Sequence, residues 1–215
     1  MTLHVVAIEA VGRSARARRL LFDDGTQRIT SNSVVRRLGL EEGSEISDCT
    51  PLSEYLEETE RSCARERALR ALAQRDYSVA DLRQRLADDG YPASIAAETV
   101  QSFVRSGLVD DERFAEAWAR SRARQGFGRR RIADELARKG IDDELAHASL
   151  DAATDDDEVA RARSLLRGQT PKDRKERERA LRRLVSRGFD LPVALRALDG
   201  ETPAQEDSET FSDAP

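Results

Sequence analysis

A glycine that recurs at intervals of about fifty residues constrains this chain most, because apolar residues recur around it in a fixed pattern. When Gly90, Gly140 and Gly188 are aligned, a leucine stands four positions before each glycine and a large apolar residue directly after it. Apolar residues also stand five and ten positions after each glycine. The aligned residues are Leu86, Leu136 and Leu184; Tyr91, Ile141 and Phe189; Ile95, Leu145 and Val193; and Val100, Leu150 and Leu198. This period predicts tandem repeats, each burying an apolar stripe partly against itself and partly against a neighbour.

The first copy has the signals of three consecutive helices. Leu69 and Leu72 form an apolar stripe at helical spacing, and Ser78, followed three residues later by an aspartate, is typical of a capping box that begins a second helix. Gly90 suits the left-handed position that ends this helix, and Gly107 ends the third. Each copy is therefore predicted to be a three-helix unit. The expected repeat core comprises Leu82, Leu86, Gly90, Ile95, Phe114, Trp118, Ile132, Leu136, Gly140, Leu145, Leu184, Gly188 and Val193.

The first part of the chain has a different pattern. Residues 3–11 and 18–22 are rich in β-forming side chains, and Asp24-Gly25 has the sequence of a hairpin turn. Residues 33–38 are typical of a short helix, which Gly39 ends. A small module of this kind is marginal alone, so we expect it to pack on the helices that follow.

The expected fold class is mainly α, with tandem three-helix repeats forming an elongated array after a small N-terminal β-hairpin and helix module. A lead-in helix precedes the first repeat, and the sequence leaves open whether it breaks near Arg61 or continues to Ala73. The predicted division is 1–48 for the N-terminal module, 49–109 for repeat 1 with its lead-in helix, 110–153 for repeat 2, 154–199 for repeat 3 and 200–215 for an acidic disordered tail.

The charge is unevenly distributed along the chain. The net charge is -5, but the last seventeen residues hold six acidic residues and no basic one, so the rest of the chain is near neutrality. The tail has too little apolar content to offset its ordering entropy, which predicts disorder. Two roles stay open for it: solubility, and shielding of a basic surface from nonspecific nucleic acid.

The motifs needed for catalysis or metal binding are missing from the sequence. No P-loop, nucleophile elbow or CxxC pair occurs, and Cys49, Cys63, His4 and His147 are isolated. No run of eighteen apolar residues occurs, and the N-terminus lacks the pattern of a signal peptide. We therefore expect a cytoplasmic protein that is not an enzyme, takes no cofactor or metal, and has no membrane partner.

An arginine cluster without acidic residues lies in repeat 2. Its members are Arg120, Arg122, Arg124, Arg129, Arg130 and Arg131. The last three begin the second helix of the repeat, where each cation is unfavourable by roughly 0.3 to 1 kcal/mol because the helix N-terminus is positive. We therefore interpret the cluster as a candidate contact for single-stranded DNA in a nucleoprotein filament or for an acidic protein surface. The alternative is a solvated helix face in an arginine-biased chain.

A second basic stretch runs from Lys172 to Arg187. Glu176 and Glu178 interrupt it, and ion pairs four residues apart are common on helix surfaces, so a solvated face is the simpler interpretation. Lys172 and Lys175 are kept as candidate contacts.

Several motifs, in order and spacing, resemble the RecX regulatory family. They are Asp76-Tyr77-Ser78 with Leu82, Leu86 and Gly90-Tyr91; Gly107-Leu108-Val109-Asp110-Asp111 with Phe114-Ala115; and Gly128, Ile132, Glu135-Leu136 and Lys139-Gly140-Ile141. The resemblance covers roughly residues 5 to 198 and excludes the acidic tail. It implies a small cytosolic bacterial protein of tandem three-helix repeats, and a monomer. It also implies binding in the groove of the RecA recombinase filament on single-stranded DNA, with a mostly inhibitory effect on ATP hydrolysis, strand exchange and coprotease action, and hence on DNA repair, recombination and the SOS response.

Two other classes of function stay open from the residues alone. A stand-alone DNA-binding protein could use the three-helix units as helix-turn-helix readers, although the near-neutral body argues against it. Weak direct contact with DNA is a separate expectation, and it accompanies binding to the recombinase filament. A helical adaptor without nucleic acid is the third class. Binding to bare single-stranded DNA, to recombinase alone and to the filament would separate the three.

Overall fold

The computed structural model describes residues 3–12, 16–46, 52–153, 158–166, 171 and 173–199. The chain divides into two compact units, Met1–Ala115 with Arg138–Asp142, and Glu116–Ala137 with Asp143–Pro215. Helix α5 (Asp111–Arg124) begins in the first unit and continues into the second. No helix of the described part is long and apolar enough to span a bilayer.

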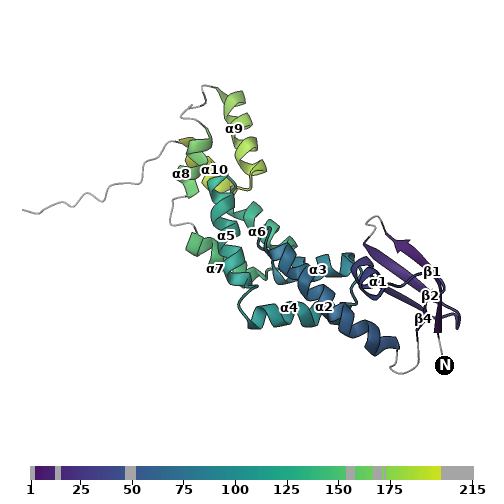
Figure 1. The fold of residues 1–215 in the computed structure, drawn as a ribbon. Helices are drawn as coiled ribbons and strands as arrows, with labels where there is room; N and C mark the ends of the chain where they lie inside the picture. The colour runs from purple at the N-terminus through teal and green to yellow at the C-terminus, as the bar shows by residue number, and fades with distance from the viewer. Residues whose placement is uncertain are drawn as a thin grey trace, which may run out of the picture. The chain divides into compact units, whose positions relative to one another are not determined.

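The first unit begins with an antiparallel sheet in the order β3-β2-β1-β4. Figure 1 shows this sheet beside helix α1 and labels three of its strands. Its strands are β1 (Leu3–Val11), β2 (Ala17–Phe22), β3 (Gln27–Ser31) and β4 (Glu45–Ile46). The turn between β2 and β3 forms where the sequence predicted it: Gly25 has a φ of 82°, and the Asp24 carboxylate accepts hydrogen bonds from the amide and the hydroxyl of Thr26. Helix α1 (Asn32–Leu38) follows and ends at left-handed Gly39.

Helices α2 (Leu52–Leu72), α3 (Val79–Asp88) and α4 (Ala93–Arg105) complete the first unit. Helix α1 packs against α2 and against β2 and β3. A buried ion pair ties the sheet to α2: fully buried Glu60 accepts from Arg28 Nη2 at 2.8 Å and from Thr30 Oγ1 at 2.7 Å. The N-terminal module therefore has both apolar and charged contacts with the helices behind it.

Helix α2 continues without a break past Arg61, which settles the alternative that the sequence left open. Leu69 was predicted to share the apolar stripe of this helix with Leu72, and this prediction is wrong, because the Leu69 side chain is 41% exposed. The buried face is formed instead by Leu56, Cys63 and three alanines. Short side chains occupy this face because they let neighbouring helices approach closely. The alanines are Ala64, Ala68 and Ala71.

The remaining helices are α6 (Arg129–Arg138), α7 (Asp143–Ala153), α8 (Glu158–Leu165), α9 (Arg174–Ser186) and α10 (Leu191–Asp199). In the second unit α10 packs on both α8 and α9. The mainly α fold with tandem three-helix repeats and an N-terminal strand module is thus confirmed. The five-part division and the elongated arrangement stay predictions, and residues 200–215 and Cys49 lie outside the described residues.

The aligned positions of the repeats behave alike. Gly90, Gly140 and Gly188 all have positive φ, at 94°, 76° and 88°. The residues four before and one after each glycine are buried in all three copies, as are those ten after. The residues five positions after each glycine are less uniform, because Ile95 is buried whereas Leu145 and Val193 are half-buried. Of the other expected core residues, Leu82, Phe114 and Ile132 are buried and Trp118 is half-buried.

Each aligned glycine allows a close approach that a Cβ would block. A Cβ at Gly90 would lie 2.6 Å from the Thr30 carbonyl oxygen, and one at Gly140 would lie 2.4 Å from the Cβ of Ala80 in α3. A Cβ at Gly188 would lie 2.3 Å from the Cβ of Arg131 in α6. The glycine that ends the middle helix of a repeat therefore packs on the module that precedes this repeat: the N-terminal sheet for Gly90, α3 for Gly140 and α6 for Gly188. In the last two cases the contact is with the first turn of the preceding middle helix.

Hydrogen bonds complete the joint in the first unit, formed by the start of α3, the start of α5 and the turn at Gly140. The Ser78 hydroxyl donates to the carbonyl of Lys139 at 2.7 Å, and the Val79 amide donates to the Asp111 carboxylate at 2.9 Å. Burial raises the pKa of the Asp111 carboxyl, although the hydrogen bond from Val79 opposes this shift. We call this arrangement the first joint.

Candidate functional site

The arginines predicted to contact a partner lie on the last turns of α5 and the first turn of α6 in the second unit. Two of them make contacts along the surface of α5. Arg120 pairs with Glu116 at 3.1 Å, one turn earlier on the same helix, and Arg124 Nε donates to the Arg120 carbonyl at 3.3 Å. Pairs of this kind are exposed and contribute little to stability.

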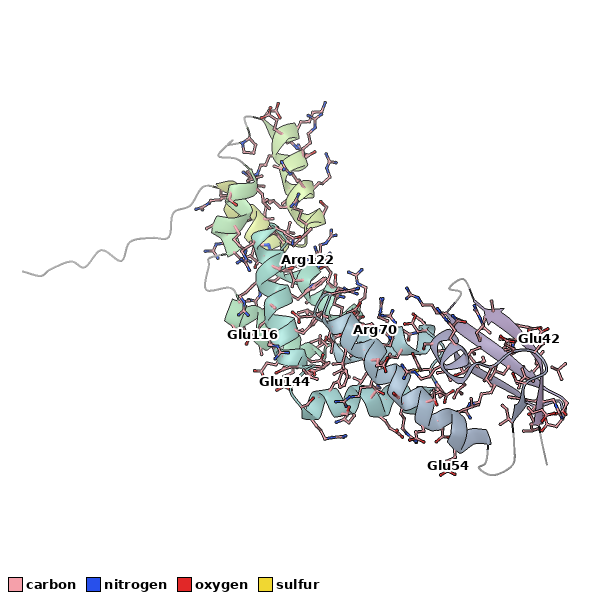
Figure 2. All side chains as sticks on the ribbon, viewed as in Figure 1. Glu42, Glu54, Arg70, Glu116, Arg122 and Glu144 are labelled. Carbon is pink, nitrogen blue, oxygen red and sulfur yellow. The ribbon has the colours of Figure 1, made fainter. Side chains whose placement is uncertain are left out.

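Arg122 and Arg131 instead share one buried carboxylate. The Glu135 side chain is 10% exposed and accepts hydrogen bonds from Arg122 Nε at 2.6 Å and from Arg131 Nε at 3.3 Å. Its Oε2 atom also accepts from the Trp118 indole at 3.2 Å. Arg122, labelled in Figure 2, donates in addition to the Gln125 side chain at 2.9 Å. These bonds fix the orientation of both guanidinium groups before any partner arrives.

Phe127 is surrounded by three guanidinium groups. The guanidinium carbons of Arg131, Arg122 and Arg187 lie 4.5, 5.2 and 5.6 Å from the centre of the Phe127 ring. Distances within about 6 Å allow attraction between a cation and the electron-rich face of a ring. We call Arg122, Arg131, Arg187, Phe127 and Glu135 the guanidinium cluster; its formal charge is three positive groups against one carboxylate.

A second joint, the counterpart of the first, positions this cluster. The Gly128 amide donates to the Arg187 carbonyl at 2.9 Å, and the Arg130 amide donates to the Gly188 carbonyl at 3.2 Å. A Cβ at Gly128 would lie 2.3 Å from the Gly188 backbone, so only glycine permits this approach. Arg187 Nη1 then donates to the Gln125 carbonyl at 3.2 Å. Arg187 therefore reaches Phe127 because α9 ends against the start of α6.

Arg129 and Arg130 differ from each other although they are neighbours. The Arg129 amide donates to the Glu158 carboxylate at 2.9 Å, as Val79 does to an acidic residue in the first joint, and its guanidinium pairs with Asp151 at 2.5 Å. The Arg130 side chain is exposed and has no ion pair within the described part of the chain. Of the three arginines that begin α6, Arg130 is thus the one whose side chain is available to a partner.

The second basic stretch is only partly described, because Lys172 lies outside the described residues. Lys175 is exposed on the first turn of α9, and Arg174 pairs with Glu178 at 3.1 Å along the helix surface. Arg187, which was predicted to lie on the same solvated face, belongs to the guanidinium cluster. The sequence could have indicated this only through Phe127, an aromatic residue between two glycines in an arginine-rich segment.

The arrangement suits recognition of anions. Guanidinium groups present planar sets of donors that match phosphate and carboxylate oxygens, and preorganised groups lose less entropy on binding. Among the described residues no group of His, Cys, Asp and Glu side chains is arranged to hold a metal ion. The cluster can therefore bind a charged partner, and it contains no nucleophile paired with a general base.

Comparison with known proteins identifies the repeats. Residues 64–103 match the family model described as the first three-helix domain of RecX, and residues 110–150 match the second. A RecX regulatory protein of Chromohalobacter salexigens is 35% identical over 145 residues, which are 65% of this chain and 93% of that protein. A RecX regulatory protein of Mycolicibacterium vanbaalenii is 37% identical over 150 residues, which are 64% of this chain and 82% of that protein.

A solved structure supports the same assignment at the level of the fold. The crystal structure of a regulatory protein RecX superposes with a TM-score of 0.60 at 19% identity, covering 92% of this chain and 99% of that one. The two domain matches lie in tandem, and they coincide with the helices that carry the aligned glycines Gly90 and Gly140. The chain belongs to the RecX family of regulatory proteins.

Proposed function

We propose that this protein regulates a RecA-class recombinase by binding the filament that the recombinase forms on single-stranded DNA. The effect is mostly inhibitory, on ATP hydrolysis, strand exchange and coprotease activity, and it controls DNA repair and recombination in the cytoplasm. The observation that carries this proposal is membership of the RecX family. The protein acts as a monomer and performs no reaction of its own. Its sequence has no phosphate-binding loop, so ATP binding is assigned to the recombinase.

The guanidinium cluster and Arg130 supply the contact with the filament. Three fixed guanidinium groups with a single carboxylate leave an excess of positive charge, which favours DNA phosphates or an acidic recombinase surface. Arg130 adds an exposed cation beside them. Tandem repeats suit a partner that is itself a helical repeat, because each has a regular surface along its length.

Three binding measurements test the proposal. Affinity is measured for bare single-stranded DNA, for recombinase without DNA, and for the recombinase filament with ATP, at one salt concentration because phosphate contacts depend strongly on salt. We expect a clear preference for the filament and a matching inhibition of its ATP hydrolysis. Equal or tighter binding to bare DNA would instead establish a stand-alone DNA-binding protein, and binding to none of the three would refute both.

A single charge reversal tests the contact residues. Arg129 and Arg131 take part in ion pairs that support the fold, so their replacement would confound stability with binding. Arg130→Glu avoids this, and Arg83→Glu is a matched control because Arg83 is an exposed arginine on the corresponding helix α3. We expect Arg130→Glu to weaken filament inhibition while Arg83→Glu leaves it nearly unchanged. Equal inhibition by the two variants would place Arg130 in solvent.

A further inference from the structure

An open hollow of about 330 Å³ lies in the first unit, between the start of α1, the C-terminal half of α2 and the end of α3. Four arginines line it, with one carboxylate and several hydroxyl groups. The volume is at the lower end of the range for small-molecule sites. The arginines are Arg16, Arg36, Arg67 and Arg70, the last of which is labelled in Figure 2.

The single carboxylate in the hollow already has two partners. Asp89 is buried, and its two oxygens accept from Arg16 Nη1 at 3.2 Å and from Arg67 Nε at 2.5 Å. Arg36 is exposed and has no ion pair in the part of the chain that the structure describes. Arg70 lies 3.7 Å from the Glu66 carboxylate along the α2 surface, and its Nε donates to the Glu66 carbonyl at 3.3 Å. Four guanidinium groups therefore line the hollow with one carboxylate, and two of the four already pair with that carboxylate.

Hydroxyl groups complete the lining of the hollow. Tyr91 Oη and Ser33 Oγ are 2.7 Å apart, and Ser33 Oγ and Ser31 Oγ are 2.9 Å apart. Each hydroxyl can donate one proton and can also accept a hydrogen bond. The two contacts between the three hydroxyls use two of their three protons, so the third proton can be donated to an anion in the hollow. Ser31 is also the N-cap of α1, which fixes its position.

We propose that this hollow binds a phosphate group. The four arginines and one carboxylate that line the hollow leave an excess of three positive charges. A terminal phosphate carries close to two negative charges and three acceptor oxygens, so it offsets most of this excess. Arg36 and Arg70 bind its oxygens, and the hydroxyl chain donates to it. The Asp89 bridge holds Arg16 and Arg67 in place. The proposal is independent of the filament-binding function, since none of these residues belongs to the guanidinium cluster.

Two sources of phosphate share this chemistry: a free nucleotide and the backbone or 5′ end of a nucleic acid. Binding of pyrophosphate to the full-length protein is measured by calorimetry, and competition is then measured with ATP and with oligothymidylate that carries or lacks a 5′ phosphate. Competition by ATP alone identifies a nucleotide site, and competition by the oligonucleotide identifies a nucleic-acid contact. Either result supports the proposal.

Matched variants locate the binding. The double variant Arg36→Ala/Arg70→Ala removes two charged donors that no buried bond needs, so pyrophosphate affinity should fall at least about tenfold. Arg37→Ala is the control, because Arg37 is the next residue on α1 but bonds to Ser62 and Glu66. In NMR spectra, the amides of residues 31–36 should shift on titration while the Trp118 indole in the second unit stays in place.

Three outcomes would overturn the proposal. The first is no saturable binding of pyrophosphate, ATP or oligonucleotide at millimolar concentration. The second is an equal loss of affinity in Arg37→Ala and in the double variant, which would indicate general charge attraction. The third is tighter binding of polyglutamate than of any phosphate probe, which would assign the hollow to an acidic protein segment.

Discussion

The second joint can be tested by comparing two glycine substitutions in the same unit. Gly126 and Gly188 both have positive φ, at 79° and 88°, and the same pair of backbone hydrogen bonds closes the helix before each of them. A Cβ at Gly126 would meet the end of the flexible Leu165 side chain at 2.7 Å. A Cβ at Gly188 would meet the Arg131 backbone nitrogen at 2.6 Å. Only the second collision involves backbone.

The expected magnitudes follow from this difference. Both alanine variants incur the strain of a left-handed residue, of order 1 to 3 kcal/mol. Gly188→Ala adds overpacking of about 1 to 3 kcal/mol. It also weakens the hydrogen bonds from the Gly128 and Arg130 amides, at about 0.5 to 1.5 kcal/mol each. We therefore expect Gly188→Ala to lower the free energy of unfolding by about 2 kcal/mol or more beyond Gly126→Ala.

Trp118 provides the assay. It is the only tryptophan of the chain, it lies in the second unit, and its indole donates to Glu135 in the guanidinium cluster. Denaturant unfolding followed by its fluorescence therefore reports on this unit, and the free energy is obtained by linear extrapolation. If the two variants unfold with the same free energy, the close approach at Gly188 contributes nothing and the joint is refuted as a source of stability.

Three further predictions concern acidic groups, of which Glu135 and Glu60 are buried and Asp111 is half-buried. Glu135→Ala leaves the guanidinium groups uncompensated and the Trp118 indole unpaired, so unfolding should become easier by about 1 to 3 kcal/mol with a shift in tryptophan emission; an unchanged spectrum would contradict this. Glu60→Ala breaks a buried ion pair and should lower the free energy of unfolding by about 3 to 5 kcal/mol, measured by denaturant unfolding followed by circular dichroism. Thr30→Val removes one hydrogen bond and should lower it by about 1 kcal/mol. Asp111→Asn should stabilise the protein at pH 7, because burial raises the pKa of this carboxyl above its usual 3.8 and the native chain loses stability as pH rises through the folded pKa. The advantage should vanish below pH 3.8, and a gain that is constant with pH would contradict the assignment.

Most of the local structure could be predicted from the sequence. Ser78 caps α3 and accepts from the Asp81 amide at 3.1 Å, as its spacing predicted, and the arginines 129–131 do begin α6. These features depend on neighbours within a few residues. The error at Leu69 has a different origin, since hydrophobicity favours leucine while close helix packing selects the alanines beside it.

The guanidinium cluster could not be predicted in this way. It joins residues from α5, α6 and the end of α9, and the last of these is separated from Arg122 by more than sixty positions in the chain. What brings Arg187 to Phe127 is the approach of two glycine backbones, Gly128 and Gly188, and a glycine gives no sign of which partner it meets. A glycine in the sequence indicates that another backbone can come close to it, whereas only the fold determines which segment does so.

The structure also changes the argument about the arginines at the start of α6. Cations there are unfavourable in an isolated helix, which made a functional reason attractive. In the folded protein, carboxylates offset that cost: Glu158 accepts from the Arg129 amide, Asp151 pairs with the Arg129 side chain, and Glu135 pairs with Arg131. Folding alone can therefore account for Arg129 and Arg131. Arg130 has no such compensation among the described residues, so the case for contact with a partner is strongest at that one side chain.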